Sequence, residues 1–235
     1  MLECLVRHKR EVRRIWMDRG ARSDAKISSI LEIAKERGIR ADRVDRKELD
    51  KMAKGRVHNG VIAHADPLEG WTTKALLDDI FARGDDPFLV LADGLSYEHN
   101  LGAILRTSLG FGVNGLILPT RRGASVSPVV QRVSMGAVEE VPIVHEGLFS
   151  ALKHIKKAGI PVIGADMNGK SMTELRMAGP VALIMGAEGS GLSSKLRERC
   201  TAIASIPLAG QLESLNVSVA AAVLMYEKRR QDGWF

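Results

Sequence analysis

The sequence predicts an α/β protein with a parallel β-sheet, preceded by a smaller α/β domain. Short apolar runs of strand length alternate with helical patterns along most of the 235 residues. Repeated strand–helix units of this kind place helices on both faces of a parallel sheet. A composition of 45% apolar and 26% charged residues is ordinary for a globular protein with a substantial core.

The first 66 residues have the pattern of a compact βαβαβ unit. Residues 12–17 and 61–65 are strand-like, and an amphipathic helix between them ends at Gly38. The apolar residues of this helix recur at the spacing of one helical face: Ile27, Ile30, Leu31 and Ala34. Such alternation favours an α/β layer over a helical bundle. We therefore expect a small domain at residues 1–66.

A linker is predicted at residues 67–87, which contain proline, glycine and a charged, helix-like stretch at 73–83. The larger domain is expected at residues 88–235. Its strands are predicted at residues 88–92, 116–118, 141–144, 161–165, 181–185 and 202–206. Its helices are expected from Asn100 onward, at 148–157 and at 214–230. The last helix is apolar all round in its first turns, so it is expected to be covered on more than one side.

A net charge of +6 and a pI near 9.5 favour a polyanionic partner. Arginines are concentrated between Arg7 and Arg22, and the alternative interpretation of such a cluster is a solvated surface. The longest apolar stretches are too short for a membrane span, and no secretory signal is expected. Cys4 and Cys200 lack metal-ligand spacing and suit a reducing compartment. We therefore expect a cytoplasmic protein without a metal.

One glycine pattern has two possible interpretations. Residues 110–115 satisfy G-x-G-x-x-G, the fingerprint of dinucleotide-binding folds. That fingerprint requires a strand before the glycines and a helix after them, and here the order is reversed. The glycines are therefore expected to end one helix and turn into the next strand.

Three polar segments interrupt the apolar pattern of the larger domain. Asn100 and Arg106 lie six residues apart, a glycine-rich turn at residues 186–191 follows the strand 181–185, and Ser214 and Asn216 precede the last helix. Each has an ordinary explanation, as a helix cap or a tight turn. An apolar helix needs only one cap, so a second polar group beside it suggests a ligand.

Together the three segments resemble the motifs of the SpoU (TrmH) family of RNA ribose 2'-O-methyltransferases. The similarity covers residues 88–231, and the motifs occur in the family's order. The resemblance implies a domain of the SPOUT type with a carboxyl-terminal trefoil knot, S-adenosylmethionine as cofactor and a homodimer. It implies catalytic-site roles for Asn100, Arg106, Glu188, Ser214 and Asn216. It implies cofactor contacts for Gly186, Ile206 and Leu215, with Leu208 as a neighbouring wall.

The sequence also departs from the family pattern. His58-Asn59-Gly60 resembles the His-Gln-Gly segment that closes the small RNA-binding domain of many relatives, with asparagine in place of glutamine. Tyr97-Glu98 replaces the Asp-Pro that usually begins the first motif, and His99 has no catalytic role in the pattern. The resemblance implies that the leading domain holds the RNA and that the larger domain transfers the methyl group.

The chemistry requires a ribose 2'-hydroxyl aligned with an activated methyl group, and removal of the hydroxyl proton. The resemblance makes Arg106 the proposed base. Arginine normally stays protonated, so the competing role is orientation and charge stabilisation. The layout is most similar to bacterial enzymes that methylate a guanosine ribose in large-subunit ribosomal RNA. The alternatives are a transfer-RNA ribose methyltransferase and a catalytically silent RNA-binding or ribosome-assembly protein.

Overall fold

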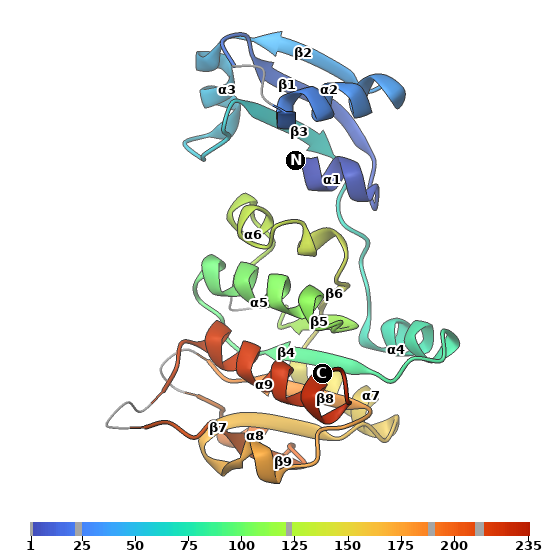
Figure 1. The fold of residues 1–235 in the computed structure, drawn as a ribbon, viewed down its shortest axis with the longest axis vertical. Helices are drawn as coiled ribbons and strands as arrows, with labels where there is room; N and C mark the ends of the chain where they lie inside the picture. Colours follow the sequence, from blue (N-terminus) through green and yellow to red (C-terminus); the bar gives the residue numbers. More distant parts are fainter. Residues whose placement is uncertain (1, 22–24, 121–123, 188–190, 210–213) are drawn as a thin grey trace. The chain divides into compact units, whose positions relative to one another are not determined.

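The chain folds into two compact units, Met1–Glu69 and Gly70–Phe235, in a computed structural model (Figure 1). The structure describes residues 2–21, 25–120, 124–187, 191–209 and 214–235. The division between the units falls inside the segment predicted as a linker.

The leading unit contains a three-stranded sheet in the order β2-β1-β3. Strand β1 (Val12–Asp18) pairs parallel to β2 (Arg40–Val44) and antiparallel to β3 (Val61–Ala65). Helix α2 (Ala25–Glu36) and α3 (Arg46–Ala53) complete the predicted βαβαβ order, and α1 (Leu2–Arg7), which was not predicted, precedes it.

The apolar core of this unit lies between α1, α2 and one face of the sheet. Ile15 and Met17 of β1 pack against Ile27, Ile30 and other apolar residues of the helices. Side chains alternate between the two faces of a strand, so Asp18 faces away from this core. Arg46 of α3 forms an ion pair with Asp18 (Nη1–Oδ2 3.2 Å), which indicates that α3 lies on the sheet face opposite α2.

The larger unit contains a six-stranded sheet in the order β6-β5-β4-β8-β7-β9, and every neighbouring pair of strands is parallel. Its strands are β4 (Phe88–Ala92), β5 (Gly115–Leu118), β6 (Ile143–His145), β7 (Val162–Ser171), β8 (Val181–Met185) and β9 (Ala202–Ser205). Its helices are α4 (Thr73–Ala82), α5 (Glu98–Gly110), α6 (Pro128–Val133), α7 (Leu148–Lys157), α8 (Ser194–Arg197) and α9 (Val217–Gln231). The predicted parallel α/β sheet is confirmed.

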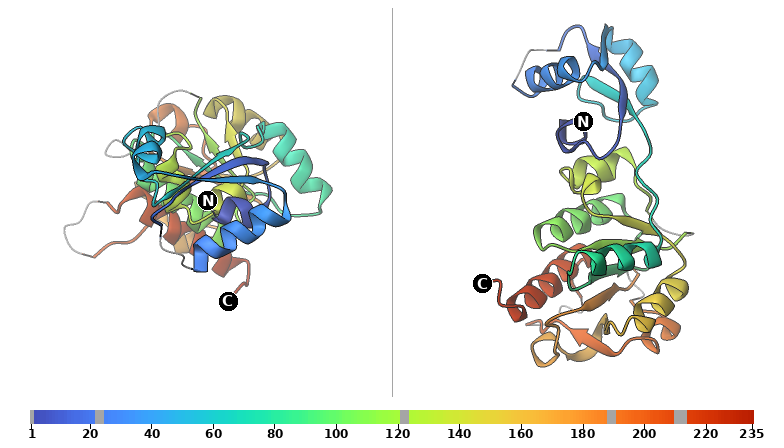
Figure 2. Two further views of the ribbon diagram at one scale, coloured as in Figure 1. Left: turned by 90° about the horizontal axis from the view of Figure 1, so that it is seen from above. Right: turned by 90° about the vertical axis from the view of Figure 1, so that its right-hand side faces the viewer.

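Helices cover both faces of this sheet. Helices α4 and α7 pack on one face, where Leu76 and Leu152 meet the strand residues Leu89 and Leu91. Helices α5 and α9 contact each other along their lengths, and Lys228 of α9 lies over the ring of Phe88 on the other face (Figure 2). Central strands buried on both faces explain why β4, β5 and β8 are uninterrupted apolar runs.

The expectations for two helices need correction. The helix-like stretch inside the predicted linker is α4, and its Leu76, Leu77 and Ile80 belong to the core of the larger unit. The last helix begins at Val217 instead of Ser214, because the side chain of Asn216 accepts the N–H of Ser218 and caps it. Its later turns, beyond those predicted to be apolar all round, bury Glu227 and Lys228.

The glycines at 110–115 join α5 to β5, and Gly112 has φ of +61° between them. This is the helix-to-strand order that the sequence predicts, and it does not fit a dinucleotide-binding turn. Within the described residues, no helix is both long and apolar enough to cross a membrane.

Candidate functional site

The polar segments meet at the carboxyl edge of the large sheet. The amide of Asp93, directly after β4, donates to the carbonyl of Met185 at the end of β8 (2.9 Å). The next residues also touch, since a Cβ on Gly94 would lie 3.1 Å from the Cβ of Ala187. Gly94 has φ of +65°, a conformation that glycine adopts without strain. The first residues after β4 and β8 therefore lie side by side.

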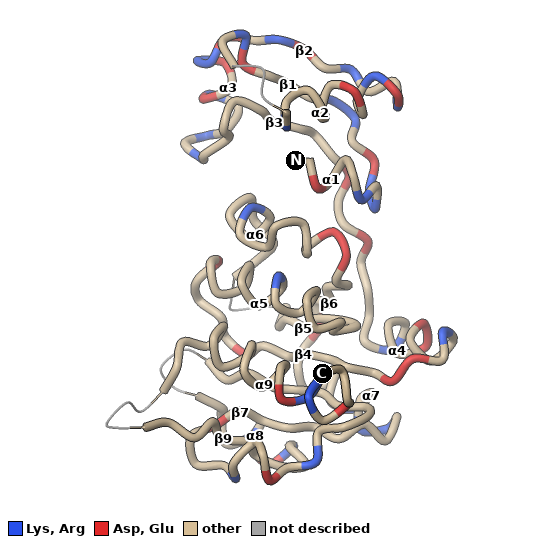
Figure 3. Tube along the Cα trace, in the orientation of Figure 1, with Lys and Arg blue, Asp and Glu red and all other residues tan. Residues whose placement is uncertain are grey.

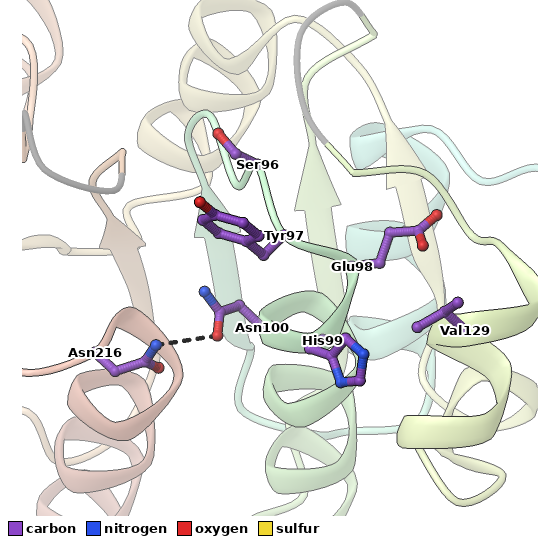
Figure 4. Close-up of a pocket in the computed structure, with 7 residues that line it drawn as sticks. All are labelled: Ser96, Tyr97, Glu98, His99, Asn100, Val129 and Asn216. Atoms are coloured by element: carbon purple, nitrogen blue, oxygen red, sulfur yellow. Dashed lines mark hydrogen bonds between the residues drawn. The ribbon is translucent and has the colours of Figure 1, made fainter.

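The starts of α5 and α9 are joined directly. The side-chain amide of Asn216 donates to the side-chain carbonyl of Asn100 (Nδ2–Oδ1 3.1 Å), and the other end of the Asn216 amide caps α9. An open pocket of about 550 Å³ lies at this junction. It is lined by Ser96, Tyr97, Glu98, His99, Asn100, Val129 and Asn216 (Figure 4).

Two of the predicted cofactor positions follow the ends of neighbouring strands. Gly186 follows β8 and Ile206 follows β9, on either side of the end of β7. Gly186 is buried, and a Cβ there would lie 2.4 Å from the backbone carbon of Gly191. The turn closes through a reciprocal pair of backbone hydrogen bonds between Ala187 and Gly191 (2.9 and 3.0 Å). Glycine is therefore required at position 186 by the turn itself.

The apolar positions predicted to hold the cofactor are partly open. Ile206 and Leu215 are half-buried, and Leu208 is 36% exposed. Aliphatic side chains left open beside a sheet edge suit the flat, largely apolar faces of an adenine ring.

The structure does not bring every predicted residue to the pocket. Arg106 is exposed on α5, about 9 Å along the helix axis from Asn100 and turned away from it by about 120°. Within the described part of the chain it has no hydrogen-bonding or ion-pair partner. Ser214 is exposed two residues before the cap of α9. Glu188 lies outside the described residues.

Sequence reasoning missed several residues at this edge. Tyr97 is 68% exposed at the pocket, and Val129 belongs to α6, which was not predicted. Asp93 directly follows a fully buried strand, a position that could have been noticed in the sequence. Burial raises the pKa of Asp93 above its ordinary value.

A second carboxylate, Asp166, follows the regular part of β7 at the same edge. It accepts the N–H of Asn168 (2.9 Å) and forms an ion pair with Arg197 (3.0 Å). Burial alone would raise the pKa of Asp166, but these two donors outweigh it and hold the pKa below its ordinary value. The pKa values of Asp93 and Asp166 are therefore shifted in opposite directions at one edge of the sheet.

The fold is that of an α/β protein with an open parallel sheet, a class that binds ligands at the carboxyl ends of its strands. The chain belongs to the SpoU rRNA Methylase family, whose family model matches residues 87–226. A second family model, RNA 2'-O ribose methyltransferase substrate binding, matches residues 1–71. The resemblance stated from the three motifs is thereby confirmed.

Relatives match along nearly the whole chain. The 23S rRNA (guanosine-2'-O-)-methyltransferase RlmB of Pseudomonas aeruginosa is 37% identical, covering 98% of this chain and 93% of the relative. An uncharacterized tRNA/rRNA methyltransferase of Mycolicibacterium vanbaalenii is 38% identical, covering 98% of this chain and 74% of the relative. The SpoU methyltransferase AviRb from Streptomyces viridochromogenes, solved with the cofactor AdoMet, has a TM-score of 0.79 and 26% identity, covering 98% of this chain and 86% of that one.

Proposed function

We propose that this protein transfers a methyl group from S-adenosylmethionine to a ribose 2'-hydroxyl of ribosomal RNA, at a guanosine of the large-subunit RNA. The observation that carries the proposal is the Asn100–Asn216 pair, which joins two family motifs at an open pocket. Family membership supports the reaction, and the name of the Pseudomonas aeruginosa relative supports the substrate.

The test is mass-spectrometric mapping of ribose methylation in total RNA from cells with and without the gene. Loss of one methylated guanosine in large-subunit RNA is the expected result. Loss of a methylated transfer-RNA nucleotide would favour the alternative substrate, which the name of the Mycolicibacterium relative also covers. No change in methylation, with retained RNA binding, would favour a silent RNA-binding protein.

Gly186, Ile206, Leu208 and Leu215 would hold the cofactor. Gly186 has no side chain and would let the backbone approach the cofactor, and the three aliphatic side chains offer a partly open apolar wall. When bound, S-adenosylmethionine supplies a methyl group already activated by its sulfonium. The protein then has to bind and orient the ribose, exclude water and provide for the departing proton.

Asn100 and Asn216 are suited to orienting the ribose. A side-chain amide both donates and accepts, so this pair can contact a hydroxyl as donor or acceptor without a change in charge. Ser214 and Glu188 complete the proposed polar set, and Glu188 lies outside the described residues. Arg106 would act as base or as a charge-stabilising group, and its position on an exposed turn of α5 suits contact with an RNA phosphate that takes up the proton.

A homodimer is part of the proposal. The outer side of α9 leaves Val219 48% and Tyr226 49% exposed. Tyr226 stacks on Phe235 (ring centroids 5.1 Å apart), which is itself 70% exposed. A second subunit covering this aromatic face would remove apolar surface from water. Light scattering should give twice the monomer mass at micromolar concentration, and a monomer mass would contradict the proposal.

We also propose that the carboxyl-terminal segments form the trefoil knot of the family. Its support is the path of the chain: β9 lies at one edge of the sheet, whereas α9 packs beside α5, which follows the central strand β4. The final segment therefore returns across the sheet after β9.

A ribosomal RNA substrate favours a cytoplasmic location. The leading unit would hold the RNA while the larger unit transfers the methyl group.

A further inference from the structure

The described arginines between Arg7 and Arg19 form ion pairs and hydrogen bonds within the leading unit. Arg7 pairs with Glu3 (3.0 Å), and Arg14 pairs with Asp42 (2.7 Å). Further ion pairs of this stretch join Arg13 to Asp66 and Arg19 to Asp45, and Arg10 donates to the carbonyl of Asp66. Carboxylates beside these guanidinium groups weaken the positive potential that RNA would meet there. The basic stretch that the sequence singles out is therefore not the strongest candidate for an RNA surface.

Helix α3 carries a different basic surface. Lys47 and Lys51 are spaced at i and i+4, which places them on one side of α3, and Lys54 follows directly as the C-cap of the helix. Leu49 is fully buried on the opposite side, so the three lysines point to solvent, and each is exposed. None of them has a carboxylate within ion-pair distance among the residues described. Lysines and arginines are marked along α3 and the turn after it in Figure 3.

The turn after α3 adds Arg56 and has a fixed shape. Lys54 and Gly55 both have positive φ (49° and 78°), and the N–H of Arg56 donates to the carbonyl of Ala53 (3.0 Å). Positive φ at a lysine is uncommon, which indicates that the turn is held by its surroundings.

His58 fixes the other end of this turn. Its side chain is only 7% exposed, and its Nδ1 accepts the N–H of Gly60 (3.0 Å). The neutral ring therefore carries its proton on Nε2, which donates to the carboxylate of Asp50 on α3 (2.9 Å). Three carboxylates lie near the lysines in the sequence: Asp45, Glu48 and Asp50. Asp50 accepts from His58, and Asp45 pairs with Arg19. Of the three, only Glu48 has no such partner among the described residues.

We infer that Lys47, Lys51, Lys54 and Arg56, here called the lysine stripe, bind the phosphodiester backbone of the RNA substrate. The inference rests on the proposed function and adds the surface by which the leading unit holds RNA. The three lysines span about 10 Å along the helix axis. Exposed cations without carboxylate partners keep their full attraction for phosphates and release counterions on binding. Base recognition is not required of such a surface.

The test compares two triple variants of the full chain. In the stripe variant, Lys47, Lys51 and Lys54 are each replaced by Gln. In the control, Lys9, Lys26 and Lys35, three exposed lysines elsewhere in the same unit, are replaced in the same way. Both variants lose the same charge and bury nothing new. Circular-dichroism melts of both proteins establish that the leading unit is folded.

Binding is measured by fluorescence anisotropy with a labelled fragment of large-subunit ribosomal RNA at several salt concentrations. We expect the stripe variant to bind about 10- to 100-fold more weakly at low salt, and the control to stay within about 2-fold of the unchanged protein. The slope of log affinity against log salt should fall by about 2 in the stripe variant alone, since each lost phosphate contact removes about 0.7–0.9. Equal losses in both variants, or none in either, would overturn the inference.

Isothermal titration with S-adenosylmethionine separates this result from the proposed function. The stripe lies in the leading unit, so cofactor affinity should be the same in all three proteins. If the unchanged protein bound RNA through the stripe but neither bound the cofactor nor transferred a methyl group, the proposed function would fail and the RNA surface would remain.

Discussion

Asn216 donates a hydrogen bond to Asn100 although 116 residues separate them. The same Asn216 side chain accepts the N–H of Ser218 (2.9 Å) and so caps α9. One amide thus fixes the start of the last helix and holds it against the start of α5. The oxygen of the Asn216 side chain caps α9 and its nitrogen contacts Asn100, so a substitution that keeps only the oxygen can test the two contacts separately.

Replacing Asn216 by Asp keeps the capping oxygen and removes the donor to Asn100. Asp caps helices about as well as Asn, so the thermal midpoint should change little. Methyl transfer to RNA should fall by at least about 10-fold, because two carbonyl-type oxygens would then face each other at the pocket. Asn216→Ala is the matched variant, and it should lose activity and also about 1 kcal/mol of stability. Full activity in Asn216→Asp would remove the amide pair from the site.

Tyr97 offers a second test of the pocket. Its ring is 68% exposed beside Asn100, an unusual position for an aromatic side chain without a ligand. We expect a nucleobase to stack on it, an interaction that contributes about 1–3 kcal/mol per base. Tyr97→Ala should raise the KM for RNA about 10-fold or more with little change in kcat, whereas Tyr97→Phe should behave like the unchanged protein. Equal KM values in all three would exclude stacking.

Elements whose burial gives a regular pattern in the sequence were predictable, and placements that depend on distant contacts were not. The strand at residues 181–185 and the helix at 148–157 were predicted with the bounds they have. The buried strand is a continuous apolar run, and the half-buried helix has apolar residues at helical spacing. The amphipathic stretch in α4 was noticed but placed in a linker, since its partner Leu152 lies 76 residues away from Leu76. Tertiary contacts of this kind decide which unit a helix joins, and they cannot be predicted from the local sequence pattern.

The candidate site was predictable to a similar extent. The three motifs directed attention to Asn100 and Asn216, which the structure joins. Tyr97 and Val129 were not predicted as site residues because they matter only through their place beside this pair. Arg106 lies on the same helix as Asn100, yet six residues turn it to another side.

Two substitutions at the proposed cofactor site should differ in their effect on stability. At position 186 even a Cβ would overlap the backbone of Gly191, so Gly186→Ala should lower the thermal midpoint as well as abolish cofactor binding. Any larger side chain would disturb the turn at least as much. Leu208 is 36% exposed, so Leu208→Ser should weaken cofactor binding measured by calorimetry with little change in stability. A normal cofactor affinity for Leu208→Ser would take this residue out of the proposed wall.

Asp93 should make stability depend on pH in a particular direction. Burial raises its pKa in the folded protein, so its contribution is fully present below the unfolded pKa of about 3.9 and is lost as pH rises through the folded pKa. Asp93→Asn cannot ionise at this position, so its stability does not fall with pH for this reason. The thermal midpoint of the variant minus that of the unchanged protein should therefore increase as pH rises from about 4 to 8.

Asp166 supplies the opposite control for this measurement. Its folded pKa is lowered, so its contribution is present above the unfolded pKa and is lost as pH falls through the folded pKa. Asp166→Asn should be less stable than the unchanged protein at pH 7, and the difference should shrink toward acidic pH. Parallel profiles for the two variants would show that the environments of these two carboxylates have been misassigned.

The end of α9 depends on a buried charge. Lys228 is 1% exposed, and its ammonium group donates to Asp232, which also accepts from Arg229 (2.9 Å) and from the backbone of Gly179 (3.0 Å). Burial lowers the pKa of Lys228 even with this partner in place. Asp232→Asn would leave the ammonium buried without its counterion, at an expected loss of about 3 kcal/mol in unfolding free energy.

Lys228→Met removes the buried charge itself and leaves Asp232 with Arg229, so it should lose much less stability. The double variant Lys228→Met with Asp232→Asn should then be more stable than Asp232→Asn alone, because the charge that made the single change costly is gone. Urea unfolding of the four proteins gives the interaction free energy between the two positions. If the losses in unfolding free energy of the two single variants simply add in the double variant, the pair does not stabilise α9 through charge. The last helix would then be anchored by Arg229, which donates hydrogen bonds to the carbonyls of Phe111 and Gly112.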